Sequence, residues 1–173
     1  MGITTYRYFR LIQHEKVTPP ELYYKKEYVK GKELEEKFMQ IYVKDDDNKS
    51  IEYPDIIERP LFLVSEALKK VVKIYNKDLE VHAVVLTGAR DTNSQEIYWH
   101  LKPPIINHCL SDKSEYAREI LKKPVINRAK TENLNFFRIT NLLQTLYIVR
   151  LDLAESIIRR GLVGFKLEGL EEE

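Results

Sequence analysis

Hydrophobic and polar positions follow the same plan in two segments, residues 60–72 and 146–158. Each segment starts with a short apolar run, continues with polar residues that can cap a helix, and ends in an amphipathic stretch. The plan predicts a strand that leads directly into a helix in both places. Because the two segments share the pattern but little identity, we interpret them as convergence on a common unit rather than as a duplication.

Each predicted helix carries a signal at its start. Ser65 is the expected N-cap of a helix over residues 65–75, because its hydroxyl can accept a hydrogen bond from an amide of the first turn. Asp152 and Glu155 form a D-x-x-E version of the capping box before a helix over residues 153–160. The glycine that follows the second helix, Gly161, is the expected left-handed terminator.

Alternation with a period of two predicts strands elsewhere. Residues 37–43 place Met39, Ile41 and Val43 on one face of a strand. The opposite face then carries Phe38, Gln40 and Tyr42. Two further strands, residues 80–87 and 96–101, are joined by a small and polar segment and predict an antiparallel hairpin with a long loop.

The predicted elements together define a fold class. Apolar positions in residues 111–121 favour a third short helix. We therefore expect an α+β fold, a mostly antiparallel sheet with two or three helices packed on one side. A length of 173 residues suits a single domain over residues 1–173, in which residues 1–36 form a less certain strand and loop region.

Bulk composition narrows the class of protein. The chain has 28 basic and 27 acidic side chains, and this balance disfavours nucleic acid as a partner. Cys109 is the only cysteine, so no disulfide can form within the chain, as is typical of the cytoplasm. The N-terminus has no secretory signal, and no apolar run approaches the ~18 residues needed to span a membrane. We expect a cytoplasmic protein without a membrane partner, and a homo-oligomer stays open.

No motif in the chain points to a particular chemistry. The four histidines lack metal-ligand spacing, and the acidic segment at residues 45–48 lacks the Gly and Glu that a calcium loop needs. Cys109 follows His108 directly, which suits a buried structural thiol better than an activated nucleophile. There is no phosphate-binding glycine loop. We therefore predict no catalytic, cofactor-binding or metal-binding residue.

Aromatic residues suggest a contact surface instead. The chain holds 11 tyrosines, and residues 23–30 interleave Tyr with Lys. Tyrosine combines a large apolar ring with a hydroxyl that tolerates water, so it suits contact surfaces as well as strands. The loop at residues 88–95 is a second expected exposed site. Our candidate partner-contact residues are Tyr23, Tyr24, Lys25, Tyr28, Arg90 and Asp91.

Three short segments, taken in order, resemble a known family. They are residues 60–68, which open the first helix, residues 108–114 in mid-chain, and residues 136–139 before the last strand–helix–strand unit. This order is similar to that of a bacterial immunity-protein-like family that is found beside polymorphic toxins and is otherwise uncharacterised, over roughly residues 37–170. The resemblance implies a small intracellular immunity protein, an antagonist that binds a cognate toxin and blocks it. It implies no catalytic residues and no cofactor.

Two functions from different classes follow. The first is a non-enzymatic binding protein, an immunity-type antagonist of a bacterial toxin, which a flat or protruding aromatic surface would favour. The alternative is a small hydrolase or transferase with a dispersed active site around His82 and His100. A deep pocket that holds either histidine beside a carboxylate would favour the enzyme.

Overall fold

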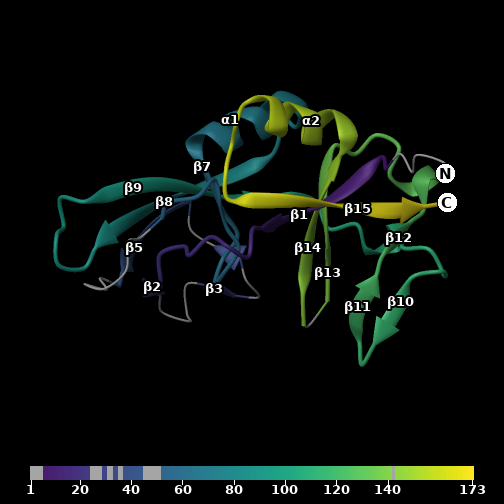
Figure 1. Ribbon diagram of the computed structural model, residues 1–173, viewed down its shortest axis with the longest axis horizontal. Helices are drawn as coiled ribbons and strands as arrows, with labels where there is room; N and C mark the ends of the chain where they lie inside the picture. The colour runs from purple at the N-terminus through teal and green to yellow at the C-terminus, as the bar shows by residue number, and fades with distance from the viewer. Residues whose placement is uncertain (1–5, 24–28, 31–32, 35–36, 45–51, 142) are drawn as a thin grey trace. The chain divides into compact units, whose positions relative to one another are not determined.

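The computed structural model describes residues 6–23, 29–30, 33–34, 37–44, 52–141 and 143–173 (Figure 1). Strands make up 45% and helices 17% of these residues, and the described part of the chain has two α-helices. The expected α+β fold with two or three helices on one side of a sheet is therefore wrong, and the fold is β-rich. The physical reason is that many short segments pair as strands of two to four residues, a length at which alternation cannot be recognised in a sequence.

The chain divides into two compact units. Unit 1 comprises Met1–Ile12, Pro103–Gly161 and Lys166–Glu173, and unit 2 comprises Gln13–Lys102 and Leu162–Phe165. Each unit contains one large sheet and one α-helix. The expectation of a single domain over residues 1–173 stays a prediction.

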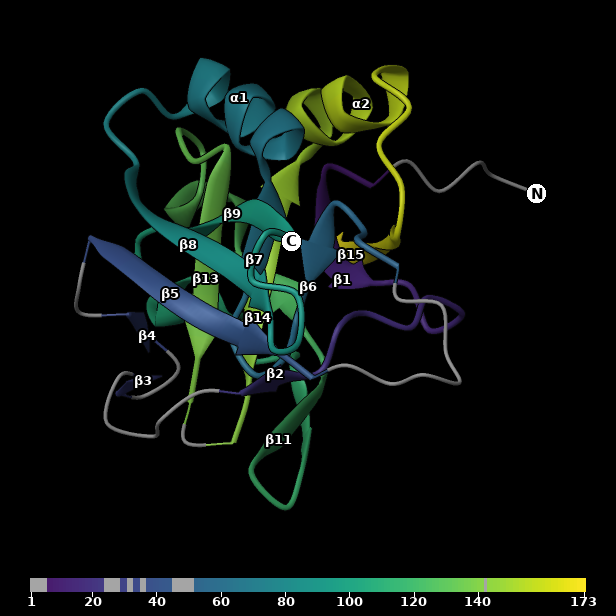
Figure 2. The same cartoon turned by 90° about the vertical axis from the view of Figure 1, so that its left-hand side faces the viewer.

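A six-stranded sheet forms the centre of unit 2 (Figure 2). Its strands, in spatial order, are β2 (Leu22–Tyr23), β5 (Phe38–Val43), β8 (Glu80–Gly88), β9 (Gln95–Lys102), β7 (Leu63–Ser65) and β6 (Ile56–Ile57). β5 and β8 run parallel, and the other neighbours are antiparallel. β3 (Val29–Lys30) and β4 (Glu33–Leu34) pair as a two-stranded sheet of their own, and β4 contacts β9. The long hairpin predicted from residues 80–101 is confirmed as β8 and β9.

The first helix, α1 (Glu66–Tyr75), continues directly from β7. Ser65 is its N-cap, as predicted, and its Oγ accepts a hydrogen bond of 3.1 Å from the Leu68 amide. The same hydroxyl donates to the Asp55 carboxylate. The apolar stripe of α1 is buried, which fixes the helix against its own unit.

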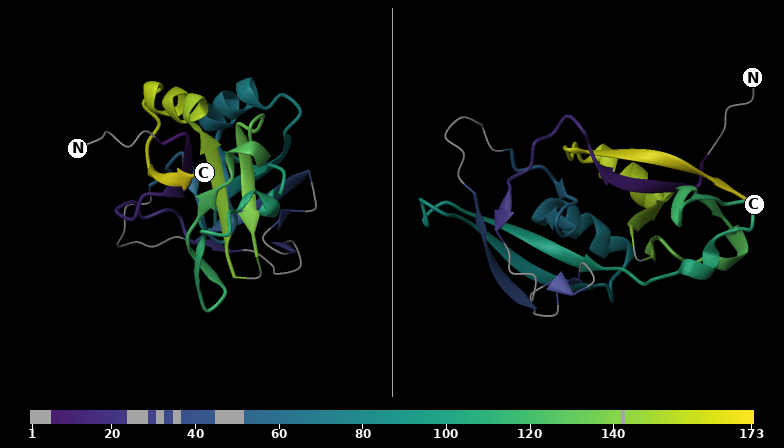
Figure 3. Two further views of the ribbon diagram at one scale, coloured as in Figure 1. Left: turned by 90° about the vertical axis from the view of Figure 1, so that its right-hand side faces the viewer. Right: turned by 90° about the horizontal axis from the view of Figure 1, so that it is seen from below.

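Unit 1 is built on a five-stranded sheet (Figure 3). Its strands, in spatial order, are β12 (Val125–Ile126), β15 (Phe165–Glu172), β1 (Tyr8–Gln13), β14 (Thr145–Arg150) and β13 (Phe136–Thr140). β12 and β15 run parallel, and one face of the sheet carries a core that includes Tyr8, Phe137 and Ile148. Two 3₁₀ turns, Asn107–Cys109 and Arg128–Lys130, connect the strands.

The helix predicted over residues 111–121 is absent from unit 1. Most of that segment forms the hairpin of β10 (Glu115–Ala117) and β11 (Ile120–Lys123). Its two turn residues, Arg118 and Glu119, have φ of 49° and 68°, values that a continuous helix excludes. Too few apolar residues recur at helical spacing here to bury a helix face, so the hairpin wins.

The second helix, α2 (Leu151–Arg159), starts two residues earlier than predicted. Its N-cap is Arg150, which makes no side-chain capping bond, so the predicted capping box does not form. Asp152 lies in the first turn, and its carboxylate accepts a 2.7 Å hydrogen bond from the Arg150 guanidinium. Gly161 has φ of 65°, which confirms it as the left-handed residue after the helix.

Candidate functional site

One face of the β2–β5–β8–β9 sheet exposes several large apolar side chains. On β5, burial alternates strictly, so Met39, Ile41 and Val43 point into the core of unit 2. The residues between them point outward, and Phe38 is 61% and Tyr42 46% exposed. We define the outer face as Tyr23, Phe38, Gln40, Tyr42, Val85 and Ile97.

Strand register makes the outer face continuous. Tyr23 on β2 pairs with Tyr42 on β5. Gln40 on β5 pairs with Val85 on β8, which in turn pairs with Ile97 on β9. Paired residues of neighbouring strands project to the same side of a sheet, so these side chains form adjoining rows. Ile97, at 56% exposed, extends the apolar surface over four strands.

The outer face has cationic borders. Phe38 lies in the same row across the sheet as Ala83 and Trp99. The Lys69 ammonium of α1 lies over the Trp99 ring, with 3.5 Å between Nζ and the ring centroid. At the other border, Lys44 Nζ lies 6.0 Å from the Tyr23 ring centroid. A protein partner gains affinity when it covers exposed aromatic rings, and a nearby lysine adds a cation–π contact at each border.

The predicted contact residues have different outcomes. Tyr23 lies on the outer face and is exposed. Tyr24, Lys25 and Tyr28 lie outside the described residues. Arg90 and Asp91 are exposed in the loop between β8 and β9, where the Asp91 carboxylate accepts the Asn93 amide at 3.0 Å; their contact role stays a prediction.

Sequence reasoning missed Phe38, Tyr42 and Ile97 as contact candidates. A signal was present for the first two, because the alternation of residues 37–43 places large apolar side chains on both faces of one strand. A strand in that position either is buried on both faces or exposes aromatic residues to a partner. Ile97 becomes part of the surface only through the β8–β9 register.

The two histidines of the alternative hypothesis are direct neighbours. His82 on β8 pairs with His100 on β9, and their ring centroids are 6.4 Å apart. His82 Nε2 lies 2.6 Å from the Glu80 carboxylate, and His100 Nδ1 lies 3.0 Å from the Phe62 carbonyl oxygen. Both residues are at most 1% exposed. A substrate could reach either imidazole only by displacing packed side chains, so this geometry is that of a packed polar pair.

Glu80 links the histidine pair to solvent. The hydrogen bond from His82, followed by the charge of nearby Lys102, holds the pKa of the Glu80 carboxyl below its usual range. A carboxyl whose pKa is lower in the folded state stabilises the fold above its unfolded pKa, and this contribution is lost as pH falls through the folded value.

We expect Glu80→Gln to lower the free energy of unfolding at pH 7 by a few tenths of a kcal/mol, because Glu80 is largely exposed and its interactions are screened. The difference from the wild type should shrink as pH falls below about 4.5, the unfolded value. Urea unfolding at pH 7 and at acidic pH measures it. Glu96→Gln, on the neighbouring strand, is the control, and an equal pH dependence in both variants would refute the role of the His82 contact.

The described residues contain neither an activated cysteine nor a metal-binding cluster. Burial raises the pKa of the Cys109 thiol to about 11, so the thiol stays protonated and weakly nucleophilic at neutral pH. Among the residues that the structure describes, no group of three or more His, Cys, Asp or Glu side chains converges as a metal site would require. The acidic segment at residues 45–48 lies outside them.

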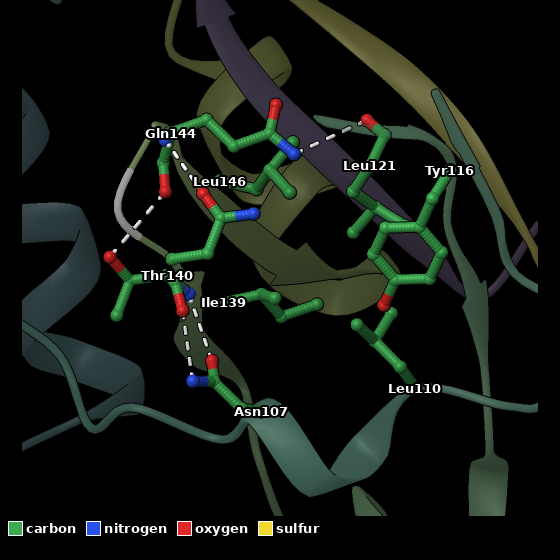
Figure 4. Close-up of a pocket in the computed structure, with 9 residues that line it drawn as sticks. Asn107, Leu110, Tyr116, Leu121, Ile139, Thr140, Gln144 and Leu146 are labelled. Carbon is green, nitrogen blue, oxygen red and sulfur yellow. Dashed lines mark hydrogen bonds between the residues drawn. The ribbon is translucent and has the colours of Figure 1, made fainter. Parts of the chain in front are cut away.

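A hollow of about 190 Å³ lies in unit 1, between the two hairpins (Figure 4). Nine residues line it: Asn107, Leu110, Tyr116, Leu121, Ile139, Thr140, Asn141, Gln144 and Leu146. Figure 4 shows the Tyr116 ring beside Leu110 and Leu121. The lining contains no carboxylate, amine, imidazole or thiol. It therefore offers a surface for binding rather than groups for acid–base chemistry.

No family model matches the chain, and no curated protein matches it either. Neither α-helix in the described part of the chain has the length and apolar character needed to cross a lipid bilayer.

Proposed function

We propose that this chain is a non-enzymatic binding protein that receives a partner protein on the outer face of its six-stranded sheet. The observation that carries the proposal is the group of exposed Tyr23, Phe38, Tyr42 and Ile97 side chains, which lie in adjoining rows on one face of the sheet. Leaving these side chains in water is unfavourable, and a matching protein surface would remove them from it.

Tyrosine and phenylalanine anchors suit this role. Each ring covers a large area and has few rotatable bonds, so little side-chain entropy is lost when a partner orders it. Gln40 lies within the outer face, and its amide already donates to the Thr87 hydroxyl at 3.0 Å. A partner that covers this amide therefore leaves its bonded N–H satisfied.

We further propose that the partner is a cognate bacterial toxin and that the chain acts in the cytoplasm as its antagonist. The support for this step is the resemblance of residues 37–170 to an immunity-protein-like family. An antagonist needs a rigid contact surface and no reactive group, and the outer face, built on paired strands, is such a surface.

Affinity capture from the native host, followed by calorimetric titration of the captured protein, tests the docking surface. We expect Ile97→Ala to weaken the affinity for the partner about 10-fold, because it truncates a contact that the complex desolvates. Ile74→Ala is the matched control, since Ile74 lies on α1 of the same unit and is 59% exposed. Equal losses in the two variants, or none in Ile97→Ala, would contradict the proposal.

Co-expression separates the toxin step from the docking step. The captured protein should arrest growth when it is expressed alone, and the chain should restore growth. A captured partner that is harmless to the cell would remove the toxin assignment and leave the outer face as a docking site. Binding that collapses between low and moderate salt would instead indicate a nucleic-acid contaminant as the true ligand.

A further inference from the structure

We propose that the hollow in unit 1 binds an uncharged aromatic ring of one or two fused cycles. This site is separate from the outer face, because all nine lining residues belong to unit 1. A test of ring binding in the hollow is therefore independent of a test of the docking function proposed above.

The size of the hollow fits such a ring. Its volume is about 190 Å³. An engineered apolar cavity of ~150 Å³ in another protein binds benzene, so a volume in this range accepts a single small aromatic molecule. Four aliphatic side chains supply apolar surface in this hollow: Leu110, Leu121, Ile139 and Leu146.

Most polar side-chain groups around the hollow already have partners. The Asn107 amide pairs with both the N–H and the C=O of Thr140, at 2.9 Å each. The Asn141 carbonyl oxygen accepts from the Leu143 and Gln144 amides, at 2.9 Å each. An apolar ligand that enters therefore strips little hydrogen-bonded water from unpaired groups.

Two side-chain hydrogen bonds fix the position of one wall of the hollow relative to the other. Gln144 Nε2 donates to the Leu121 carbonyl oxygen at 3.3 Å, and Asn141 Nδ2 donates to the Glu119 carbonyl oxygen at 3.1 Å. These two bonds tie the β10–β11 hairpin to the turn between β13 and β14. A preformed wall lowers the ordering cost of binding.

The chemistry of the lining selects against charge. A carboxylate or ammonium group on the ligand would lose hydration and find no opposite charge among the nine lining residues. Tyr116, which is 56% exposed, presents a ring for offset or edge-to-face contact and a hydroxyl near solvent. The favoured ligand is thus a neutral ring such as indole or phenol, free in solution or as the side chain of a peptide.

Titrations of the full ¹⁵N-labelled chain, followed by two-dimensional NMR, test this site. Indole should bind with a dissociation constant near or below ~1 mM, as small ligands of this size do. The amide shifts should cluster on residues 107–121 and 139–146. Indole-3-acetate, which adds only a charged arm, should bind at least 10-fold more weakly. N-acetyl-tryptophanamide distinguishes the sources: saturable binding indicates a peptide side chain, and its failure beside indole binding indicates a free small molecule.

Two variants and one control complete the test. Leu110→Trp, which fills the hollow from a half-buried position, should abolish the shifts, and Tyr116→Ala should weaken indole about 5-fold through the lost ring contact. Tyr53→Ala, at an exposed tyrosine of unit 2 that belongs to neither surface, should leave the indole affinity unchanged. Shifts spread over other residues, no saturation with any of the three ligands, or equal affinity for indole and indole-3-acetate would overturn the proposal even if Leu110→Trp failed to fold.

Discussion

Replacement of Phe38 and Tyr42 together by alanine should reduce the affinity for the protein partner about 100-fold. The two side chains lie on one face of β5, and each is about half exposed or more in the free chain. Central aromatic anchors commonly cost ~2 kcal/mol or more each when truncated, although neighbouring anchors are not fully additive. Calorimetric titration of the purified partner measures the loss.

The fold should survive this double substitution. Met39 and Ile41 on the opposite face keep the strand packed in the core of unit 2. The control is the double variant Ile74→Ala/Ile158→Ala, whose two side chains are 59% and 60% exposed on the two helices. An affinity within about threefold of the wild type in both double variants would show that the partner does not use the outer face.

Gly164→Ala should lower the free energy of unfolding by roughly 3 kcal/mol. Gly164 has φ of +83°, which costs an alanine about 1–2 kcal/mol. A Cβ at this position would also lie 2.3 Å from Pro54 Cβ, far inside van der Waals contact, and the backbone would have to shift. Urea unfolding followed by circular dichroism gives the loss.

Gly161→Ala separates the two causes. Gly161 also has positive φ, at 65°, but nothing lies within 4 Å of the added Cβ. This variant should therefore cost only about 1 kcal/mol. If the two glycine variants were destabilised equally, the close approach of Gly164 to Pro54 would carry no energy and the account of this turn would be wrong.

Local signals in the sequence predicted single elements well. Ser65 caps α1, residues 37–43 alternate as β5, and Gly161 ends α2, because each of these depends on a few neighbouring residues. Fold class depends on strand pairings between distant segments, and these pairings could not be predicted from the sequence. The parallel pairing of β12 with β15 joins residues more than forty positions apart, and β12, with two residues, is too short to show a period.

The candidate docking surface was partly predictable. The excess of tyrosine indicated an aromatic contact surface, and Tyr23 lies on it. Ile97 could not be added from sequence, because a loop of several residues between β8 and β9 leaves the register open. The same uncertainty concealed that His82 and His100 share a face.

The hollow in unit 1 had no sequence signal. Its walls come from residues between 107 and 146. The side-chain amides of Asn107, Asn141 and Gln144 connect these walls through hydrogen bonds to backbone carbonyl groups far along the chain. Polar side chains that bond to backbone have no periodic pattern. Such a site becomes visible only when the hairpins are placed.

Hydroxyl-radical footprinting of the chain, free and in complex with its captured partner, tests the docking surface most directly, because it reports solvent access ring by ring. We predict strong protection of Phe38, Tyr42 and Tyr23 in the complex, while the Tyr53 and Tyr116 rings keep their reactivity. Unchanged oxidation of Phe38 and Tyr42 at saturating partner would contradict it.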